Sequence, residues 1–166
     1  MKILCFSDSH GSFDAVGEML KKHRDAQAVF FLGDGLTDAE YHAASDTERA
    51  WIAVRGNCDF TSSFRSSPAL KVDSITLEGY KFVLTHGDSY GVKSSLYGLM
   101  ELAEEREADV VLFGHTHSPL LELRTIGERA VYFFNPGSIK EVYLNPSSYG
   151  IIELCDGAIR LTHGTL

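Results

Sequence analysis

Hydrophobic residues in this chain occur mainly in short runs, separated by segments with helical spacing or by turn residues. Strands buried on both faces of a sheet are predicted for four mostly apolar runs, at residues 2–7, 28–32, 51–54 and 110–113. Helices are predicted for three segments, at residues 13–23, 37–49 (with a weak pattern) and 93–107. The first two-thirds of the chain therefore alternates strand and helix, which indicates an α/β fold.

Hairpins dominate the last third of the predicted pattern. Three hairpins are predicted, each with a glycine in its turn, and they pair residues 70–77 with 80–85, 120–126 with 130–134, and 149–155 with 158–162. The serine-rich residues 61–68 are predicted to form a loop. We therefore expect a second, more antiparallel sheet. Because no internal repeat or linker interrupts the sequence, we expect a single domain over residues 1–166.

Composition and charge narrow the function classes. The formal net charge of −8 is unfavourable for binding nucleic acid, because basic patches supply most of that affinity. A small phosphorylated substrate remains compatible, since bound cations can reverse the local sign of the charge. Cys5, Cys58 and Cys155 are scattered, which is typical of a reducing compartment. With no targeting segment and no run of membrane-spanning length, we expect a cytoplasmic protein; a homo-oligomer is left open.

Residues that can bind metal ions follow five of the predicted strands. The strand ends carry Asp8-Ser9-His10, Gly33-Asp34, Gly56-Asn57-Cys58-Asp59, His86-Gly87-Asp88 and Gly114-His115-Thr116-His117. Each group alone has an ordinary explanation as a turn, a helix cap or a surface residue. The carboxyl ends of strands in an open α/β sheet meet at one crevice, however, so the coincidence at five strand ends predicts a shared site.

The types of these residues point to a particular chemistry. A mixed set of aspartate, asparagine and histidine suits divalent manganese, iron, zinc, nickel or cobalt. Seven candidate ligands are too many for one tetrahedral site and suit two ions that share a carboxylate. Two such ions can clamp the attacking and leaving oxygens of an in-line displacement at phosphorus.

In order and spacing, this series of motifs resembles the calcineurin-like metallophosphoesterases, from Asp8 to His117. The resemblance is strongest to the small, single-domain phosphodiesterase branch, which also has Gly-Asn-Cys-Asp as its third motif. Asn135-Pro136-Gly137-Ser138 resembles another signature of that branch. The resemblance implies two packed mixed β-sheets flanked by helices, in a four-layer sandwich.

The resemblance also implies roles for individual residues. It implies one metal site of Asp8, His10 and His117, a second of Asn57, His86 and His115, and Asp34 as the bridge between them. A hydroxide bridging two divalent ions, with Mn²⁺ favoured, would attack the phosphate ester. Asn57, His86 and Cys58 are the catalytic candidates.

Substrate contacts are expected from the loop after the third strand. Asn57 would also touch the substrate phosphate. Arg55 would either join it there or form a structural salt bridge. Asp59 and Asp88 directly follow expected ligands, so they either orient those ligands or cap the loops.

Two positions depart from the pattern of the family. Many relatives carry histidine at the position of Cys58, where it is thought to protonate the leaving group. A thiol suits that task poorly, so Cys58 either contributes weakly or only packs, and activated diesters should react best. After Ser138 the branch usually continues toward Pro-Arg, whereas this chain has Ile139-Lys140-Glu141-Val142, which removes an expected arginine contact.

Three other classes of protein are alternatives to an enzyme of this kind. The same fold serves as an interaction subunit in the retromer sorting complex, where the metal site is altered, but here every ligand position holds a ligating residue. A metal-dependent nuclease is disfavoured by the acidic balance of the chain. A metallo-β-lactamase-type hydrolase would need His-x-His-x-Asp-His, which is absent from the sequence.

Overall fold

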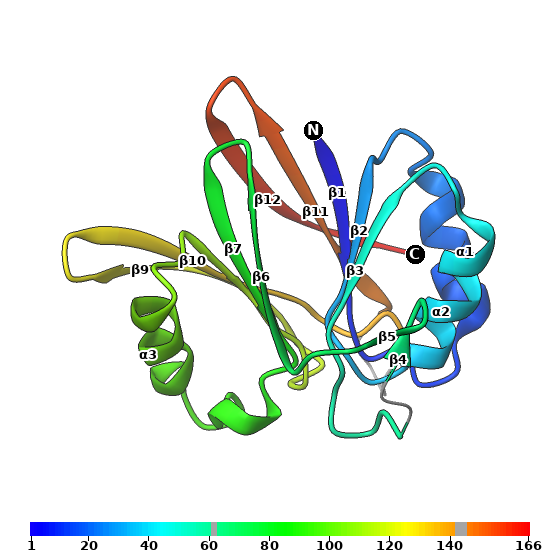
Figure 1. Cartoon of the computed structure of the whole chain (residues 1–166), viewed down its shortest axis with the longest axis horizontal. Coiled ribbons are helices and arrows are strands. Elements are labelled where there is room, and N and C mark those ends of the chain that lie inside the picture. The colour runs from blue at the N-terminus through cyan, green and yellow to red at the C-terminus, as the bar shows by residue number, and fades with distance from the viewer. Residues whose placement is uncertain (61–62, 142–145) are drawn as a thin grey trace.

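The computed structural model describes residues 1–60, 63–141 and 146–166. One sheet has five strands in the order β12-β11-β1-β2-β3 (Figure 1). Its strands are β1 (Lys2–Phe6), β2 (Ala28–Phe31), β3 (Ala50–Ala53), β11 (Ser148–Cys155) and β12 (Ala158–Thr165). β1, β2 and β3 run parallel, whereas β11 pairs antiparallel with both β1 and β12. We call this the first sheet.

The second sheet also has five strands, in the order β6-β7-β8-β10-β9. Its strands are β6 (Val72–Leu77), β7 (Tyr80–Thr85), β8 (Val110–Leu112), β9 (Pro119–Ile126) and β10 (Arg129–Pro136). The three central strands β7, β8 and β10 are parallel, and the hairpin partners β6 and β9 form antiparallel edges. Both sheets are therefore mixed.

The two sheets pack face to face through an apolar core. Alternate residues of β1 serve its two faces: Ile3 and Cys5 belong to the core between the sheets, and Leu4 and Phe6 belong to the core under the helices. Phe30 and Phe82 meet across the interface with ring centroids 6.0 Å apart. Strands covered on both faces explain the continuously apolar runs in the sequence.

Helices cover the outer face of each sheet (Figure 1). α1 (Phe13–Lys22) and α2 (Leu36–Ser45) pack on the first sheet through Val16, Met19 and Ala39. α3 (Tyr97–Glu105) packs on the second through Leu99 and Ala103. A short 3₁₀ helix, η1 (Asp88–Tyr90), precedes α3. The result is the expected four-layer α/β sandwich. Among the described residues, no helix has the length and apolar character needed to span a membrane.

Two expectations about secondary structure need correction. The predicted loop at residues 61–68 contains a small hairpin, β4 (Ser63–Phe64) and β5 (Ser67–Pro68), while residues 61 and 62 lie outside the described part. Arg65 and Ser66 take positive φ values of 48° and 65° between these strands, a tight turn that the polar composition did not reveal. The helix predicted from residue 93 begins only at Tyr97.

The expectation that the second sheet is the more antiparallel one is also wrong, because the last hairpin joins the first sheet and each sheet has two parallel and two antiparallel pairings. β11 pairs with β1 in the register Leu4↔Ile151 and Ile3↔Ile152. The backbone N–H and C=O groups along that edge of β1 need partners once the strand is buried, and the last hairpin supplies them.

Candidate metal centre

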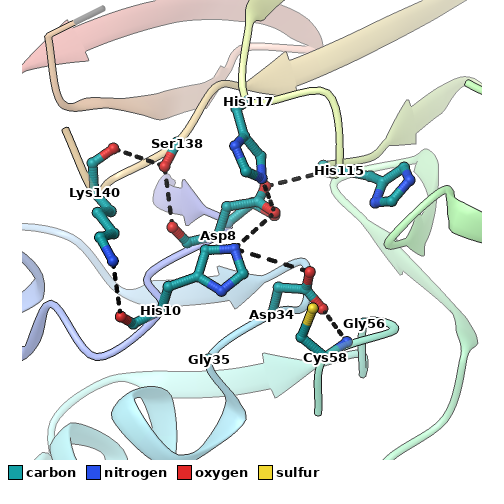
Figure 2. Close-up of polar contacts among 12 residues, drawn as sticks. Asp8, His10, Asp34, Gly35, Gly56, Cys58, His115, His117, Ser138 and Lys140 are labelled. Carbon is teal, nitrogen blue, oxygen red and sulfur yellow. Dashed lines mark hydrogen bonds and ion pairs between the residues drawn. The ribbon is translucent and has the colours of Figure 1, made fainter. Parts of the chain in front are cut away.

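Six of the seven predicted ligand residues lie together at strand ends of the two sheets, and Figure 2 labels Asp8, His10, Asp34, His115 and His117 among them. Asp8 and His10 follow β1, and Asp34 follows β2, so the first sheet contributes these three. His86 follows β7, and His115 and His117 follow β8, so the second sheet contributes the others. Strand ends from both sheets thus supply one cluster.

A first group consists of Asp8, His10 and His117, whose ligand atoms lie within 4.8 Å of one another. The Asp8 Oδ1 atom is 3.2 Å from His117 Nε2 and 3.9 Å from His10 Nε2. This oxygen is buried and has no hydrogen-bond partner among the described residues. A buried carboxylate oxygen needs a donor or a cation, so the position between Asp8 Oδ1 and the two imidazole nitrogens suits a metal ion.

A second group consists of Asp34, His86 and His115, again with ligand atoms within 4.8 Å of one another. His86 Nε2 lies 3.3 Å from Asp34 Oδ2 and 3.2 Å from His115 Nδ1. The other ring nitrogen of His86, Nδ1, lies 2.8 Å from the carbonyl oxygen of Leu32. Donation from Nδ1–H to this carbonyl leaves the Nε2 lone pair facing the cluster, as in histidine ligands of metal sites.

Asp34 lies between the two groups. Its Oδ2 is 3.9 Å from His10 Nε2, and its Oδ1 accepts a hydrogen bond of 2.7 Å from the Cys58 N–H. Burial favours the neutral acid, but the hydrogen bond and charge of His86 and the Cys58 N–H together hold the pKa of Asp34 well below its usual value. The carboxylate is therefore ionised at neutral pH and available to both groups.

The backbone is strained at five of the expected ligands. Positive φ values occur at Asp8 (57°), His10 (41°), Asp34 (61°), His115 (68°) and His117 (59°). Left-handed backbone at residues other than glycine is uncommon and is concentrated at functional sites. The strand ends are thus held in unfavourable conformations that aim these side chains at one point.

Two aspartates hold the loops that carry the ligands. Asp59 accepts hydrogen bonds of 2.7–2.9 Å from the N–H groups of Asp34, Gly35, Leu36 and Gly56. Asp38 accepts from the Ser9 hydroxyl (2.6 Å) and the Gly11 N–H (2.7 Å), on either side of His10. Of the two alternatives for Asp59, these contacts are those of a loop cap, because all four donors are backbone N–H groups.

Sequence reasoning missed Asp38, because an acidic residue in the first turn of a helix has an ordinary explanation as a dipole partner. Asp88 differs from Asp59: it pairs with Lys71 at 3.7 Å.

The Asn135–Ser138 segment supports the opposite side of the site. Asn135 Nδ2 donates to the Gly114 carbonyl (2.8 Å) and to Thr116 Oγ1 (3.0 Å), so it fixes the loop that carries His115 and His117. The Ser138 hydroxyl donates to the Asp8 carbonyl at 3.0 Å (Figure 2). Lys140 Nζ lies 3.4 Å from the His10 carbonyl oxygen, so a lysine stands at the rim where an arginine was expected from the resemblance. Val142 lies outside the described residues.

Asn57 and Cys58, which follow β3, are exposed, unlike the other predicted site residues. Asn57 is exposed, and its amide donates to Cys58 Sγ at 3.2 Å. Cys58 Sγ lies within 4.8 Å of ligand atoms of His10 and Asp34. Burial, followed by the neighbouring carboxylates of Asp34, Asp59 and Asp8, raises the pKa of the Cys58 thiol. Arg55 has no carboxylate within ion-pair distance in the described part of the chain, and its buried Nε lacks a hydrogen-bond partner there.

The donor set fits divalent metal ions. Carboxylate oxygens and imidazole nitrogens face one another at 3.2–4.0 Å, and the position between them suits a divalent metal ion. A surface depression of about 770 Å³ lies between α1 and α2, but it contains none of the clustered residues that could bind a metal ion. The chemistry of the side chains, and not cavity size, therefore locates the site.

Comparison with known proteins agrees with this geometry. The sequence profile of the calcineurin-like phosphoesterase superfamily domain matches residues 1–157. Probable metallophosphoesterase YsnB of Bacillus subtilis is 32% identical, over 93% of this chain and 85% of the relative. Phosphodiesterase YfcE of Escherichia coli K12 is 33% identical, over 92% of this chain and 88% of the relative.

Solved structures share the fold. A predicted phosphoesterase from Streptococcus pneumoniae superposes with a TM-score of 0.77 at 28% identity, covering 99% of this chain and 88% of that one. Vacuolar protein sorting 29 from Cryptosporidium parvum superposes with a TM-score of 0.73 at 15% identity, covering 99% and 97% of the two chains. At that identity, the second likeness shows the fold alone.

Proposed function

Because this chain belongs to the calcineurin-like phosphoesterase superfamily, we propose that its metal-dependent phosphoesterase activity is that of a phosphodiesterase with two ions at the site. The observation that carries the proposal is the pair of ligand groups that share the neighbourhood of Asp34. Asp8, His10 and His117 would hold one ion, His86, His115 and Asn57 the other, and Asp34 would contact both. The partnerless Asp8 Oδ1 supports the first position.

Mn²⁺ is the proposed ion, with zinc, iron, nickel and cobalt as alternatives. Carboxylate oxygens combined with imidazole nitrogens suit all of these borderline or hard ions. When bound, such ions supply Lewis-acid stabilisation of the phosphoryl oxygens and activate water for in-line attack at phosphorus.

The side chains around the ions have separate proposed roles in orienting a ligand, contacting the substrate and donating a proton. Leu32 fixes the proton of His86 on Nδ1 and keeps Nε2 on the site. Asn57 and Arg55, on the loop after β3, are proposed to contact the substrate phosphate. The raised pKa of Cys58 keeps the thiol protonated at neutral pH and makes it a weak proton donor. The leaving group therefore departs with little help from an acid, which favours activated esters.

A protein-interaction scaffold is the alternative that the fold allows. The vacuolar protein sorting 29 structures resemble this chain at 15–21% identity, so they establish only shape. All the ligating side chains are present here and six of them converge, which favours catalysis.

Further properties follow as proposals. We propose that residues 1–166 form one domain and act on a small phosphorylated substrate and not on nucleic acid. A cytoplasmic location is proposed because Cys5, Cys58 and Cys155 are all free. Self-association is left to measurement.

The test combines metal analysis with activity on 4-nitrophenyl phosphate and bis(4-nitrophenyl) phosphate, with and without added Mn²⁺. We expect two ions per chain and preferential hydrolysis of the diester. Asp34→Asn should weaken binding of both ions, whereas His117→Ala should mainly weaken one. A protein that binds no metal and hydrolyses neither ester would overturn the proposal.

A further inference from the structure

A small cavity adjoins the ion site on the side of the second sheet. Lys93, Ser94, Thr116 and Ser118 line it, and Phe113 belongs to its apolar wall. Thr116 lies between His115 and His117 in the chain, so the cavity reaches the loop that carries these two expected ligands. Its volume of about 210 Å³ is below the roughly 300–1,000 Å³ of sites that enclose a whole ligand. The cavity therefore suits one part of a substrate.

Two charged side chains line this cavity, Lys93 and Glu122. Lys93 is exposed and forms no ion pair or side-chain hydrogen bond with another described residue. The carboxylate that lines the cavity, Glu122, is already paired with Arg124. Lys93 and Thr116 line the same cavity, so the lysine lies near the loop that carries His115 and His117. Lys93 is thus free to pair with an anionic group of a bound ligand.

The polar and apolar walls narrow the chemistry of the ligand. Hydroxyl groups of Ser94 and Ser118 can bond to sugar hydroxyls or to phosphate oxygens. Phe113 and neighbouring apolar side chains suit the carbon skeleton of the same group. A phosphorylated sugar or polyol combines these features.

We propose that this cavity binds the alcohol arm of a phosphodiester substrate and that Lys93 pairs with a second phosphate carried by that arm. The proposal rests on the phosphodiesterase function proposed above. It narrows the substrate class to diesters in which one alcohol is itself phosphorylated. A small cavity on the other flank, lined by His10, Cys58 and Phe60, is left for the second arm.

The test compares thymidine 5′-(4-nitrophenyl phosphate) with its 3′-phosphorylated form in the Mn²⁺-loaded protein. We expect the 3′-phosphate to lower KM about tenfold, and we expect Lys93→Met to abolish that advantage. Lys140→Met is the matched control, because it removes the same charge from the opposite side of the ion site, as Figure 2 shows for Lys140 and His115. The control should retain the advantage of the 3′-phosphate.

A binding measurement separates this inference from the function on which it rests. By titration calorimetry, thymidine 3′,5′-bisphosphate should bind about tenfold more tightly than thymidine 5′-phosphate, and only Lys93→Met should equalise the two. Equal affinity of the wild type for the two nucleotides would show that Lys93 is a solvated surface lysine. An equal loss of the preference in both variants would show that Lys93 acts only through the overall electrostatic field of the protein. Absence of hydrolysis with the binding preference intact would overturn the phosphodiesterase function and leave the cavity assignment standing.

Discussion

At the scale of single residues, Asp59 shows how a side chain that is not an expected ligand can hold the loops that carry expected ligands. Its two oxygens accept four backbone N–H groups, which belong to the loops after β2 and β3. One carboxylate thereby fixes the backbone of Asp34 and the glycine before Asn57. Gly56 must be a glycine here, because a Cβ atom would lie 2.1 Å from Asp34 Oδ1.

Asp59→Asn should reduce both metal affinity and stability. Asparagine offers one acceptor oxygen, so two of the four N–H groups lose their partner. We expect a loss of about 1–3 kcal/mol in the free energy of unfolding and a roughly 10–100-fold loss in metal affinity. Denaturant unfolding of the metal-free protein and metal titration measure the two effects. Asp156→Asn, in the turn between β11 and β12, is the matched control and should change neither quantity.

Cys58 should set the range of leaving groups. Cys58→His places a group with a pKa of about 6.5 where the thiol now lies, so it should increase turnover of diesters with poor leaving groups about tenfold or more. Activated 4-nitrophenyl esters should gain much less. Cys58→Ser removes the thiol without adding an imidazole and should show no such change. Unchanged leaving-group dependence in Cys58→His would mean that Cys58 only packs.

At the scale of secondary-structure elements, a partly buried ion pair joins both N-terminal helices to the first sheet. Asp46 follows α2 and accepts hydrogen bonds from Arg49 Nη1 (2.8 Å) and from Trp51 Nε1 in β3 (3.1 Å). Arg49 Nη2 in turn donates to the carbonyl groups of Leu20 and His23 at the end of α1. This cluster ends α2 at Ser45, four residues before the predicted end.

Stability should depend on pH through Asp46. Burial opposes ionisation, but the hydrogen bonds from Arg49 and Trp51 lower the pKa of Asp46. A lowered pKa in the folded state stabilises the protein above the unfolded value of about 3.9, and this stabilisation is lost as the pH falls through the folded value.

Asp46→Asn should therefore be about 1–2 kcal/mol less stable than the wild type at neutral pH, and the difference should shrink below about pH 4. Denaturant unfolding of both proteins between pH 3 and pH 7 measures it. A difference that is constant over this range would contradict the assignment to Asp46.

At the scale of the whole molecule, the expected ion site links the two sheets. Asp8, His10 and Asp34 come from the first sheet, and His86, His115 and His117 come from the second. Bound ions would therefore add cross-links at one end of the apolar core. Without ions, the contacts at this end of the core are those between the carboxylates of Asp8 and Asp34 and the imidazole groups.

Removal of metal should lower the melting temperature. A ligand present at 100 times its Kd stabilises the native state by about 2.7 kcal/mol, which corresponds to roughly 5–10 °C for a chain of this size. Calorimetry of the protein with added Mn²⁺ and with a chelator measures the shift. The melting temperature of Asp34→Asn should depend little on metal. A wild-type melting temperature that does not change when the chelator is added would argue against a link between the sheets.

The sequence by itself determined the elements and the identity of the expected ligands. Buried strands need continuous apolar runs, and hairpin turns need glycine next to a polar residue, so both are visible over a few neighbouring positions. Asp8, Asp34, His86 and His115 each follow such a run directly. Their convergence could be predicted because strand ends of an α/β sheet share an edge.

Only the tertiary structure decided which residues meet across long distances in the chain. The pairing of the last hairpin with β1, the contacts of Asp59 and Asp38 with separate loops, and the place of Lys93 beside Thr116 all join distant segments. No local pattern encodes such contacts, because they depend on how buried surfaces and backbone groups find partners once the two sheets pack. The expected ligands could therefore be proposed from strand ends, whereas the groups that hold their loops and the cavity nearby became visible only in the folded chain.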